Sequence, residues 1–245
     1  QYLAASSEAL AAFGDGTMYL ERFINNPRHI EVQVIGDSHG NAIHIGERDC
    51  SLQRRHQKVI EESPAILLND ETRAKLHEVA VKATKYLKYE GAGTFEFLAD
   101  DKQNIYFMEM NTRLQVEHPV SEMVSGLDII EWMIKVAEGE KLPSQDTIKF
   151  RGHAIECRIT AEDPNNFLPC PGKITQWMVP GGRNVRVDSH IYTNYIVPPY
   201  YDSMIGKLIV WGRDREKAIN IMKRALAEFE VEGIRTTIPF HQKMM

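Results

Sequence analysis

The sequence predicts an α+β fold, with antiparallel strands in a longer first part and a smaller, strand-rich second part. Three observations predict this class. Segments rich in alternating or β-branched residues come in pairs joined by short polar turns, which is typical of hairpins. Segments with a helical spacing of apolar residues lie between these pairs. The periodic pattern is lost in residues 138–149, which contain Pro143, so we expect two domains, 1–142 and 143–245.

The first part is expected to contain three helices, five strands and a basic loop. Helices are expected at residues 2–13, from a cap at Asn69 or Asp70 to a stop at Gly91, and at 127–138. The second of these helices should bury the stripe Leu76, Val79, Ala83 and Leu87. Strands are expected at residues 18–24, 29–36, 41–47, 93–99 and 104–110, with the basic loop at 48–58.

The second part is expected to be built from strands and one clear helix. Strands are expected at residues 153–160, 173–179, 184–190 and 204–211. Asp214 is the expected cap of the helix, whose apolar stripe is Ala218, Met222, Ala225 and Phe229.

Composition excludes several classes of protein. The net charge is −5 and the pI is about 6.0, which argues against a general nucleic-acid binder. No apolar run reaches the roughly 18 residues that suggest a membrane span, and no signal peptide is evident. Cys50, Cys157 and Cys170 are widely spaced, which favours reduced thiols and a cytoplasmic location over disulfides or zinc. Nearby arginines could favour the thiolate of Cys50. Because the chain begins with Gln1, we expect a piece of a longer protein.

The predicted hairpin of residues 92–110 brings two acids together. If its turn is centred on Lys102 and Gln103, Glu96 lies directly opposite Glu109, with Cβ atoms about 5 Å apart. Two carboxylates at this distance repel, and a divalent cation removes the conflict. Hard oxygen ligands suit Mg²⁺, and Asn111, on the same face, could add a third oxygen. The alternative is an exposed hairpin with solvated acids.

The same alternation continues beyond the hairpin, in MEMNTRLQVEHPV. Arg113 offers a planar fork that suits a small oxyanion such as carboxylate, phosphate or bicarbonate. Gln115 and Glu117 follow in phase, and a carboxylate beside a bound oxyanion is a candidate general base. His118, before Pro119, is expected only to cap a turn.

Several long motifs resemble the biotin carboxylases, which are ATP-grasp enzymes. These motifs are EMNTRLQVEHPVSE, RDCSLQRRHQK, GAGTFEF, RGHAIECRITAEDP, FLPCPGKI and PPYYDSMIGKL. The resemblance covers essentially the whole chain. It implies the second half of an ATP-grasp domain, followed by a smaller β-rich biotin carboxylase C-terminal domain. It also implies that ATP phosphorylates bicarbonate to carboxyphosphate, which, directly or as CO₂, carboxylates N1 of biotin.

The resemblance also implies roles for individual residues. Glu96, Glu109 and Asn111 would hold Mg²⁺ or Mn²⁺ against the ATP phosphates. Arg113, Gln115 and the backbone of Val116 would seat bicarbonate, and Glu117 would remove its proton. Arg158 would steady the biotin enolate, and Lys58 would reach toward the same centre. In the nucleotide site, Glu21, Arg22 and Ile24 would meet adenine, and His29, Gln53 and His56 would lie near the ribose and phosphates.

Partners and alternatives follow from the same resemblance. Biotin would be carried on a biotin carboxyl carrier protein, carboxyltransferase subunits would use the product, and the protein would be a homodimer. We expect the first half-reaction of acetyl-CoA carboxylase, in fatty acid biosynthesis. The alternatives are a pyruvate or propionyl-CoA carboxylase, another ATP-grasp ligase, or a non-catalytic assembly module. The family's N-terminal domain and glycine-rich lid are not in this sequence, so the chain alone is expected to be weakly active or inactive.

Overall fold

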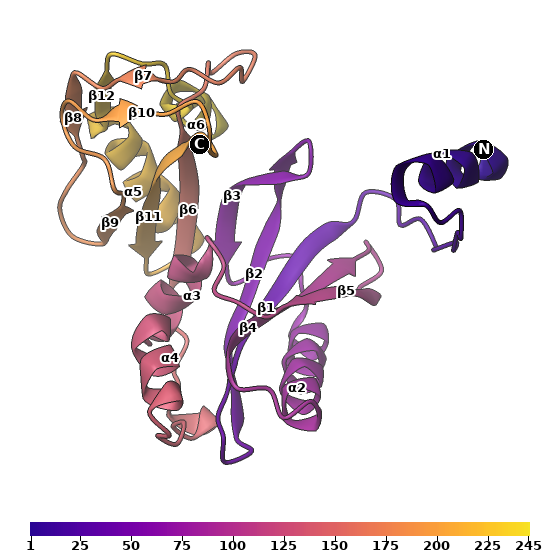
Figure 1. Ribbon diagram of the computed structural model, residues 1–245. Helices are drawn as coiled ribbons and strands as arrows, with labels where there is room; N and C mark the ends of the chain where they lie inside the picture. The colour runs from indigo at the N-terminus through magenta and orange to yellow at the C-terminus, as the bar shows by residue number, and fades with distance from the viewer.

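The computed structural model describes residues 1–245, and its main sheet is antiparallel throughout, as the sequence predicts. Eight strands pair in the order β5-β4-β1-β2-β3-β6-β11-β9, and β10-β7 and β12-β8 form two small sheets (Figure 1). The helices are α1 (Tyr2–Phe13), α2 (Asp70–Tyr86), α3 (His118–Ser125), α4 (Ile129–Ala137), α5 (Arg215–Glu228) and α6 (Ile238–Met244), with a 3₁₀ turn at Gln145–Thr147. None of these helices has the length and apolar character needed to cross a membrane.

The strands of the first part are β1 (Arg28–Gly36), β2 (Ala42–Arg54), β3 (Gln57–Ser63), β4 (Gly91–Ala99) and β5 (Ile105–Asn111). Those of the second part are β6 (His153–Thr160), β7 (Gly172–Lys173), β8 (Gln176–Met178), β9 (Val185–Asp188), β10 (Ile196–Val197), β11 (Met204–Gly212) and β12 (Glu230–Glu232). The predicted α+β class is confirmed.

The main sheet passes through both predicted domains. Strand β3 pairs with β6, with Ile60 opposite Cys157, so strands of both parts belong to one continuous sheet. Leu142 and Ile148, on either side of the predicted boundary, pack in the same apolar cluster. The division into 1–142 and 143–245 stays a prediction.

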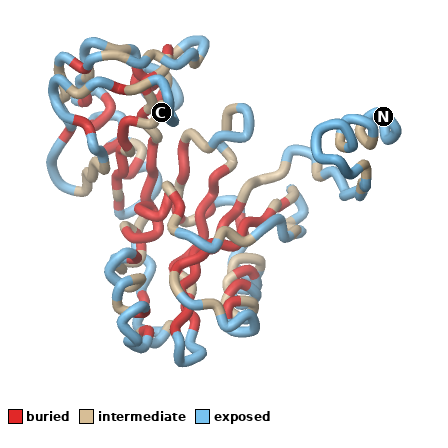
Figure 2. The backbone as a smooth tube through the Cα atoms, in the orientation of Figure 1, coloured by how far each residue is buried: buried red, intermediate tan, exposed pale blue.

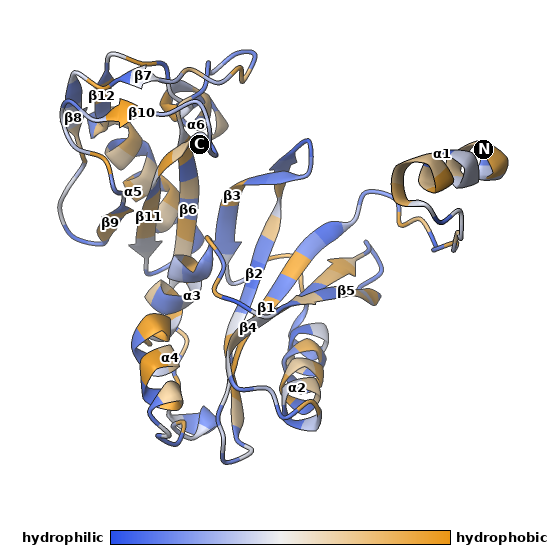
Figure 3. Cartoon of the chain, in the orientation of Figure 1, coloured by the Kyte–Doolittle hydropathy of each residue, from blue (hydrophilic) through white to orange (hydrophobic).

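Four apolar clusters hold the sheet and its helices together, the smallest of which joins α3 to β6 and β11. The largest lies in the second part, where α5 packs on β6 and β11. A second joins α2 to β1 and β4, and a third joins α4 to β1, β2 and the start of β4. Figure 3 shows α4 as the most apolar helix of the view, and Figure 2 shows that burial concentrates in the main sheet. The sheet is therefore the rigid frame from which site residues project.

The predicted strand at residues 18–24 is wrong. The backbone of residues 14–27 forms no regular strand, and Tyr19, Leu20 and Phe23 are each at least 80% exposed. Alternating apolar residues form a strand only when another strand supplies hydrogen bonds, and none lies beside this segment. It instead connects β1 to α1, which projects away from the sheet (Figures 1 and 2).

The predicted basic loop at residues 48–58 is also wrong. Strand β2 continues to Arg54 and β3 begins at Gln57, so the segment is a hairpin. Its tight turn is made by Arg55 and His56, whose φ angles are 50° and 65°. Many of the polar residues that suggested a loop line a pocket, and the two arms of the hairpin, with β1, supply one another's backbone partners.

Two helix predictions need correction, and two caps are confirmed. Helix α2 buries Leu76, but Val79 and Leu87 of the predicted stripe are 46% and 58% exposed. Helix α3 was not predicted; it begins at His118 with Pro119 in its first turn, a position that suits proline. The caps are confirmed because Asn69 and Asp214 accept backbone hydrogen bonds at 2.8 Å.

Candidate active site

A pocket of about 1450 Å³ lies between the β1–β5 part of the sheet and the second part of the chain. Its wall includes residues of β1, β2, β3, β4, β5 and β6, of the segment before β7, and of β10 and the segment that follows it. Most of the predicted site residues lie on this wall, as do the non-predicted Ser51, Phe167 and Tyr201. The sequence motifs therefore converge in space although they are more than a hundred residues apart.

The predicted opposition of two acids is confirmed in the β4–β5 hairpin. Glu96 is the direct partner of Glu109, and a bulge just beyond Glu96 shifts the rest of the register toward the turn. The side-chain amide of Asn111 donates to Glu96 Oε1 at 3.0 Å and to Glu109 Oε1 at 3.1 Å. Two carboxylates and an amide oxygen on one face form a hard donor set that fits Mg²⁺ or Mn²⁺.

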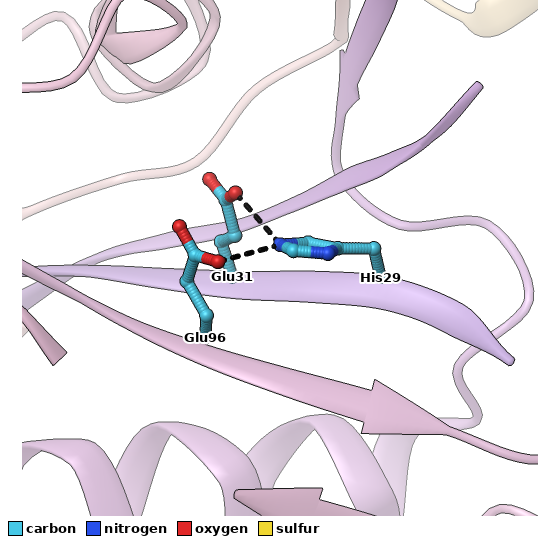
Figure 4. Close-up of side chains that lie close together, drawn as sticks. All are labelled: His29, Glu31 and Glu96. Atoms are coloured by element: carbon cyan, nitrogen blue, oxygen red, sulfur yellow. Dashed lines mark hydrogen bonds and ion pairs between the residues drawn. The ribbon is translucent and has the colours of Figure 1, made fainter. Parts of the chain in front are cut away.

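Glu31, which the sequence analysis did not identify, stands beside this set. His29 Nε2 lies 3.1 Å from Glu31 Oε1 and 3.0 Å from Glu96 Oε2 (Figure 4). Burial alone would lower the pKa of His29, but the hydrogen bonds to the two acids raise it to about 9. The ligand atoms of all three residues lie within 4.8 Å of one another, so they form a compact acid–imidazole cluster.

Lys58 connects this cluster to the predicted base. Its ammonium lies 2.6 Å from Glu117 Oε1 and 3.3 Å from Glu96 Oε1, and it also contacts Glu31. Burial on its own would lower the pKa of Lys58, but Glu31 raises it above its usual value. A single cation therefore contacts the carboxylates of two strands, β1 and β4, and of the residue that precedes α3.

Glu117 is held from a second side by Arg158. The Arg158 guanidinium lies 3.0 Å from Glu117 Oε2, while its Nε lies 2.6 Å from Glu61 Oε1. Burial would lower the pKa of Arg158, but Glu61 raises it. Glu117 is 2% exposed, so its carboxylate is fixed between two cations at the pocket floor.

Arg48 is the support beneath this floor, and the sequence analysis missed it. It has no exposed surface and donates at 2.7–3.2 Å to Glu31, Gln33, Thr94, Gln115 and Ser121. Gln115 in turn donates to Glu96 Oε1 at 2.7 Å. The polar composition of residues 48–58 predicts a loop and therefore gives no sign that Arg48 lies on a strand and is buried.

In the turn of residues 113–117, the side chain of Arg113 is exposed, whereas the backbone of Val116 is fixed by a hydrogen bond. Arg113 lies on the pocket wall and is exposed; its guanidinium contacts only Asn111 Oδ1, at 3.2 Å, and the Leu114 carbonyl. The carbonyl of Val116 accepts a hydrogen bond of 2.8 Å from Lys207 Nζ on β11. Lys207 was not predicted; it ties this turn to the second part of the chain.

All but one of the residues predicted to bind the nucleotide lie on the wall of the pocket. Arg22, Ile24, His29, Gln53 and His56 line the pocket, whereas Glu21 is exposed and lies outside its wall. Arg22 lies over the ring of Tyr106 at 5.7 Å, and Gln53 donates to the Cys50 carbonyl at 2.9 Å.

The suggestion that nearby arginines favour the thiolate of Cys50 is wrong. Its side chain has no exposed surface, and burial raises the pKa of the thiol well above its usual value. Nearby arginine residues do not compensate, because Glu31 and Glu117 face the same thiol. All three cysteines are free thiols.

Comparisons with known proteins agree with these features. Residues 1–145 match the family described as carbamoyl-phosphate synthase L chain, ATP binding domain, and residues 156–245 match the biotin carboxylase C-terminal domain. A biotin carboxylase of Nostoc sp. is 58% identical over 246 residues, covering 100% of this chain and 55% of that protein. The chain spans about half the length of the curated relatives it matches.

Solved structures give the same result. A biotin carboxylase from Campylobacter jejuni, described as a beta-gamma-ATP complex, is 69% identical, with a TM-score of 0.94 over 99% of this chain and 55% of that one. The biotin carboxylase domain of a Hydrogenobacter thermophilus 2-oxoglutarate carboxylase is 51% identical, with a TM-score of 0.93 over 99% and 54% of the two chains. That structure contains MgADP, ADP and bicarbonate.

Proposed function

The chain belongs to the biotin carboxylases, a family of ATP-grasp enzymes, and on this premise we propose that the protein carrying it carboxylates biotin with bicarbonate and ATP. The observation that carries the proposal is the position of Glu117. Its carboxylate lies between Lys58 and Arg158, on the floor of the pocket that also holds the Glu96, Glu109 and Asn111 set. A fixed acid beside cations suits proton abstraction from a small oxyanion.

We assign the metal to the β4–β5 hairpin. Glu96, Glu109 and Asn111 would hold Mg²⁺ or Mn²⁺, which, when bound, neutralises charge on the phosphate oxygens of ATP. Arg22, Ile24, His29, Gln53 and His56 would border the nucleotide, since they share the same pocket wall. Glu21 would join them only by a change of position, because it lies outside this wall.

We assign bicarbonate to the turn that follows. Arg113, Gln115 and the backbone of Val116 would bind it, and Glu117 would accept its proton as a bicarbonate oxygen attacks the γ-phosphorus of ATP and ADP leaves. Lys207 supports this assignment because it fixes the Val116 peptide from outside the pocket. The exposed Arg113 guanidinium would pair with the anion.

The carboxyl acceptor would be biotin N1. Arg158 would stabilise the enolate oxygen of biotin, and Lys58 would stand beside the reacting groups. When an anion enters, Lys58 and Arg158 can exchange part of their contact with Glu117 for contact with the ligand. Such an exchange keeps buried charge paired at each stage.

The wider context is also proposed. The downstream partner would be a carboxyltransferase of acetyl-CoA carboxylase, with biotin on a carrier protein and the enzyme a homodimer. Relatives that serve a 2-oxoglutarate or pyruvate carboxylase make a keto acid the alternative acceptor. Location in the cytoplasm stays a prediction.

The test is bicarbonate-dependent ATP hydrolysis and carboxylation of free biotin by the intact protein that carries this chain. Glu117→Gln should lower both rates by about 100-fold or more, since general bases contribute on that scale. Glu78→Gln, on the exposed face of α2, is the control and should keep both rates. Full turnover by Glu117→Gln would refute the assignment of the base, and absence of biotin carboxylation by the unsubstituted protein would refute the function.

A further inference from the structure

Two buried acids that have no part in the proposed reaction lie opposite each other beside Arg158. Glu61 on β3 and Glu156 on β6 are direct cross-strand partners. Partners in this position point to the same face of the sheet, with Cβ atoms about 5 Å apart. Neither side chain has any exposed surface, and neither lies on the wall of the pocket. The pair is therefore sealed from solvent and from substrate.

The hydrogen bonds around this pair are unequal. Glu61 Oε1 accepts from Arg158 Nε at 2.6 Å, whereas Glu61 Oε2 has no partner. Both carboxyl oxygens of Glu156 lack partners as well. A buried carboxylate that makes neither a hydrogen bond nor an ion pair costs several kcal/mol, so such a group takes up a proton instead. Glu156 meets this description and Glu61 does not.

The charges that face the pair favour the same distribution. Arg158 on β6 and Lys207 on β11 are the facing cations, and Glu117 before α3 and Glu31 on β1 are the facing anions. Burial raises the pKa of Glu156 well above its usual value, and Glu61 adds to the effect. Burial also raises the pKa of Glu61, to about 7, because Arg158 offsets only part of it.

We propose that Glu156 stays protonated beside an ionised Glu61, and that Glu61 is a positioning residue that aims Arg158 at the pocket. The guanidinium is planar, so fixing its Nε edge against Glu61 directs its far edge toward Glu117 and the ligand. Because a neutral Glu156 does not repel the Glu61 carboxylate, Glu61 can stay ionised and pair with Arg158. The proposal rests on the proposed function only for the step in which Arg158 meets biotin.

Infrared spectroscopy of the intact protein tests the protonation without using activity. At pH 8 we expect a protonated carboxyl band that is absent in Glu156→Gln, which is an isostere of the neutral acid. Glu62→Gln is the matched control: Glu62 is the next residue of β3, faces the other way, and pairs with His153 and Arg215. The proposal is overturned if Glu156→Gln removes no such band, or if Glu62→Gln removes it.

Kinetics test the positioning role. Glu61→Gln should lower biotin carboxylation by about 10-fold to 100-fold, the scale expected when a reacting group loses its alignment. Bicarbonate-dependent ATP hydrolysis measured without biotin should fall far less. The unsubstituted enzyme should also lose biotin carboxylation relative to ATP hydrolysis as pH falls through about 7, and Glu61→Gln should flatten this ratio.

The outcomes separate the two proposals. Equal loss of both rates in Glu61→Gln, or an unchanged ratio across pH, would overturn the positioning role. If Arg158→Gln keeps full biotin carboxylation, the proposed function of Arg158 fails, whereas the infrared result for Glu156 is unaffected. Thermal unfolding of each variant identifies any that lose the fold, and the Glu156→Gln spectrum then decides the protonation independently.

Discussion

The floor and the rim of the pocket are built differently. On the floor, Glu31, Glu96 and Glu117 are buried, and every one of them contacts Lys58. On the rim, Glu109 and Arg113 are exposed and contact little beyond Asn111. Buried charge must be paired before any ligand arrives, whereas exposed charge is satisfied by water. The side chains of the floor are therefore fixed by ion pairs when the protein folds, whereas those of the rim are still available to pair with a ligand.

The largest effect on stability should come from substituting Arg48, which supports the floor of the pocket. Arg48→Met is expected to lower the free energy of unfolding by about 3–5 kcal/mol, because it leaves Glu31 buried without its main counter-charge. Arg113→Met, on the rim, should change it by less than about 0.5 kcal/mol. Urea unfolding followed by circular dichroism measures both. Similar losses in the two variants would contradict the division into floor and rim.

The stability of the protein should depend on pH through His241, which lies beneath the floor of the pocket. His241 Nε2 is hydrogen-bonded to the Arg158 carbonyl at 2.7 Å, yet burial lowers the pKa of this histidine to about 4. The unfolded chain then binds the extra proton first, so stability is complete above about pH 6.5 and falls toward pH 4, by about 3 kcal/mol. In His241→Gln, unfolding midpoints measured between pH 7 and 4 should fall less steeply. An unchanged slope would show that other groups cause the loss.

A smaller difference should separate the two acids of the hairpin. Glu96→Gln should lower the free energy of unfolding by about 1–3 kcal/mol, because Glu96 has charged and amide partners on the floor. Glu109→Gln should lower it by less than about 0.5 kcal/mol. Both should weaken Mn²⁺ binding in calorimetric titration. Unchanged Mn²⁺ affinity in either variant would remove that residue from the metal site.

The smallest structural effect should accompany Arg113→Lys. Stability should not change, because the side chain is exposed, but the KM for bicarbonate should rise by about tenfold with loss of the planar fork. Initial rates of ATP hydrolysis across a bicarbonate series provide the measurement. An unchanged KM would show that Arg113 does not bind this anion.

Local signals gave the right elements where the partner was close in sequence. The caps at Asn69 and Asp214 and the Glu96–Glu109 register all depend on residues within one turn or one hairpin. The same reasoning failed at residues 18–24 and 48–58. At residues 18–24 the outcome depends on whether a distant strand supplies backbone hydrogen bonds, which no local pattern contains. At residues 48–58 the two arms of one hairpin pair with each other, but their polar composition is that of a loop.

The site shows the same division. The sequence by itself determined the antiparallel hairpin, the series of polar site residues from Glu96 to Glu117 and the family to which these motifs belong. Only the tertiary structure decided that Arg48, Glu31 and Lys207 support that series and that Glu156 faces Glu61. These contacts join residues from separate parts of the chain, and the energy that fixes the ion pairs among them is the pairing of charge removed from water. That energy depends on burial, which exists only once the sheet has closed.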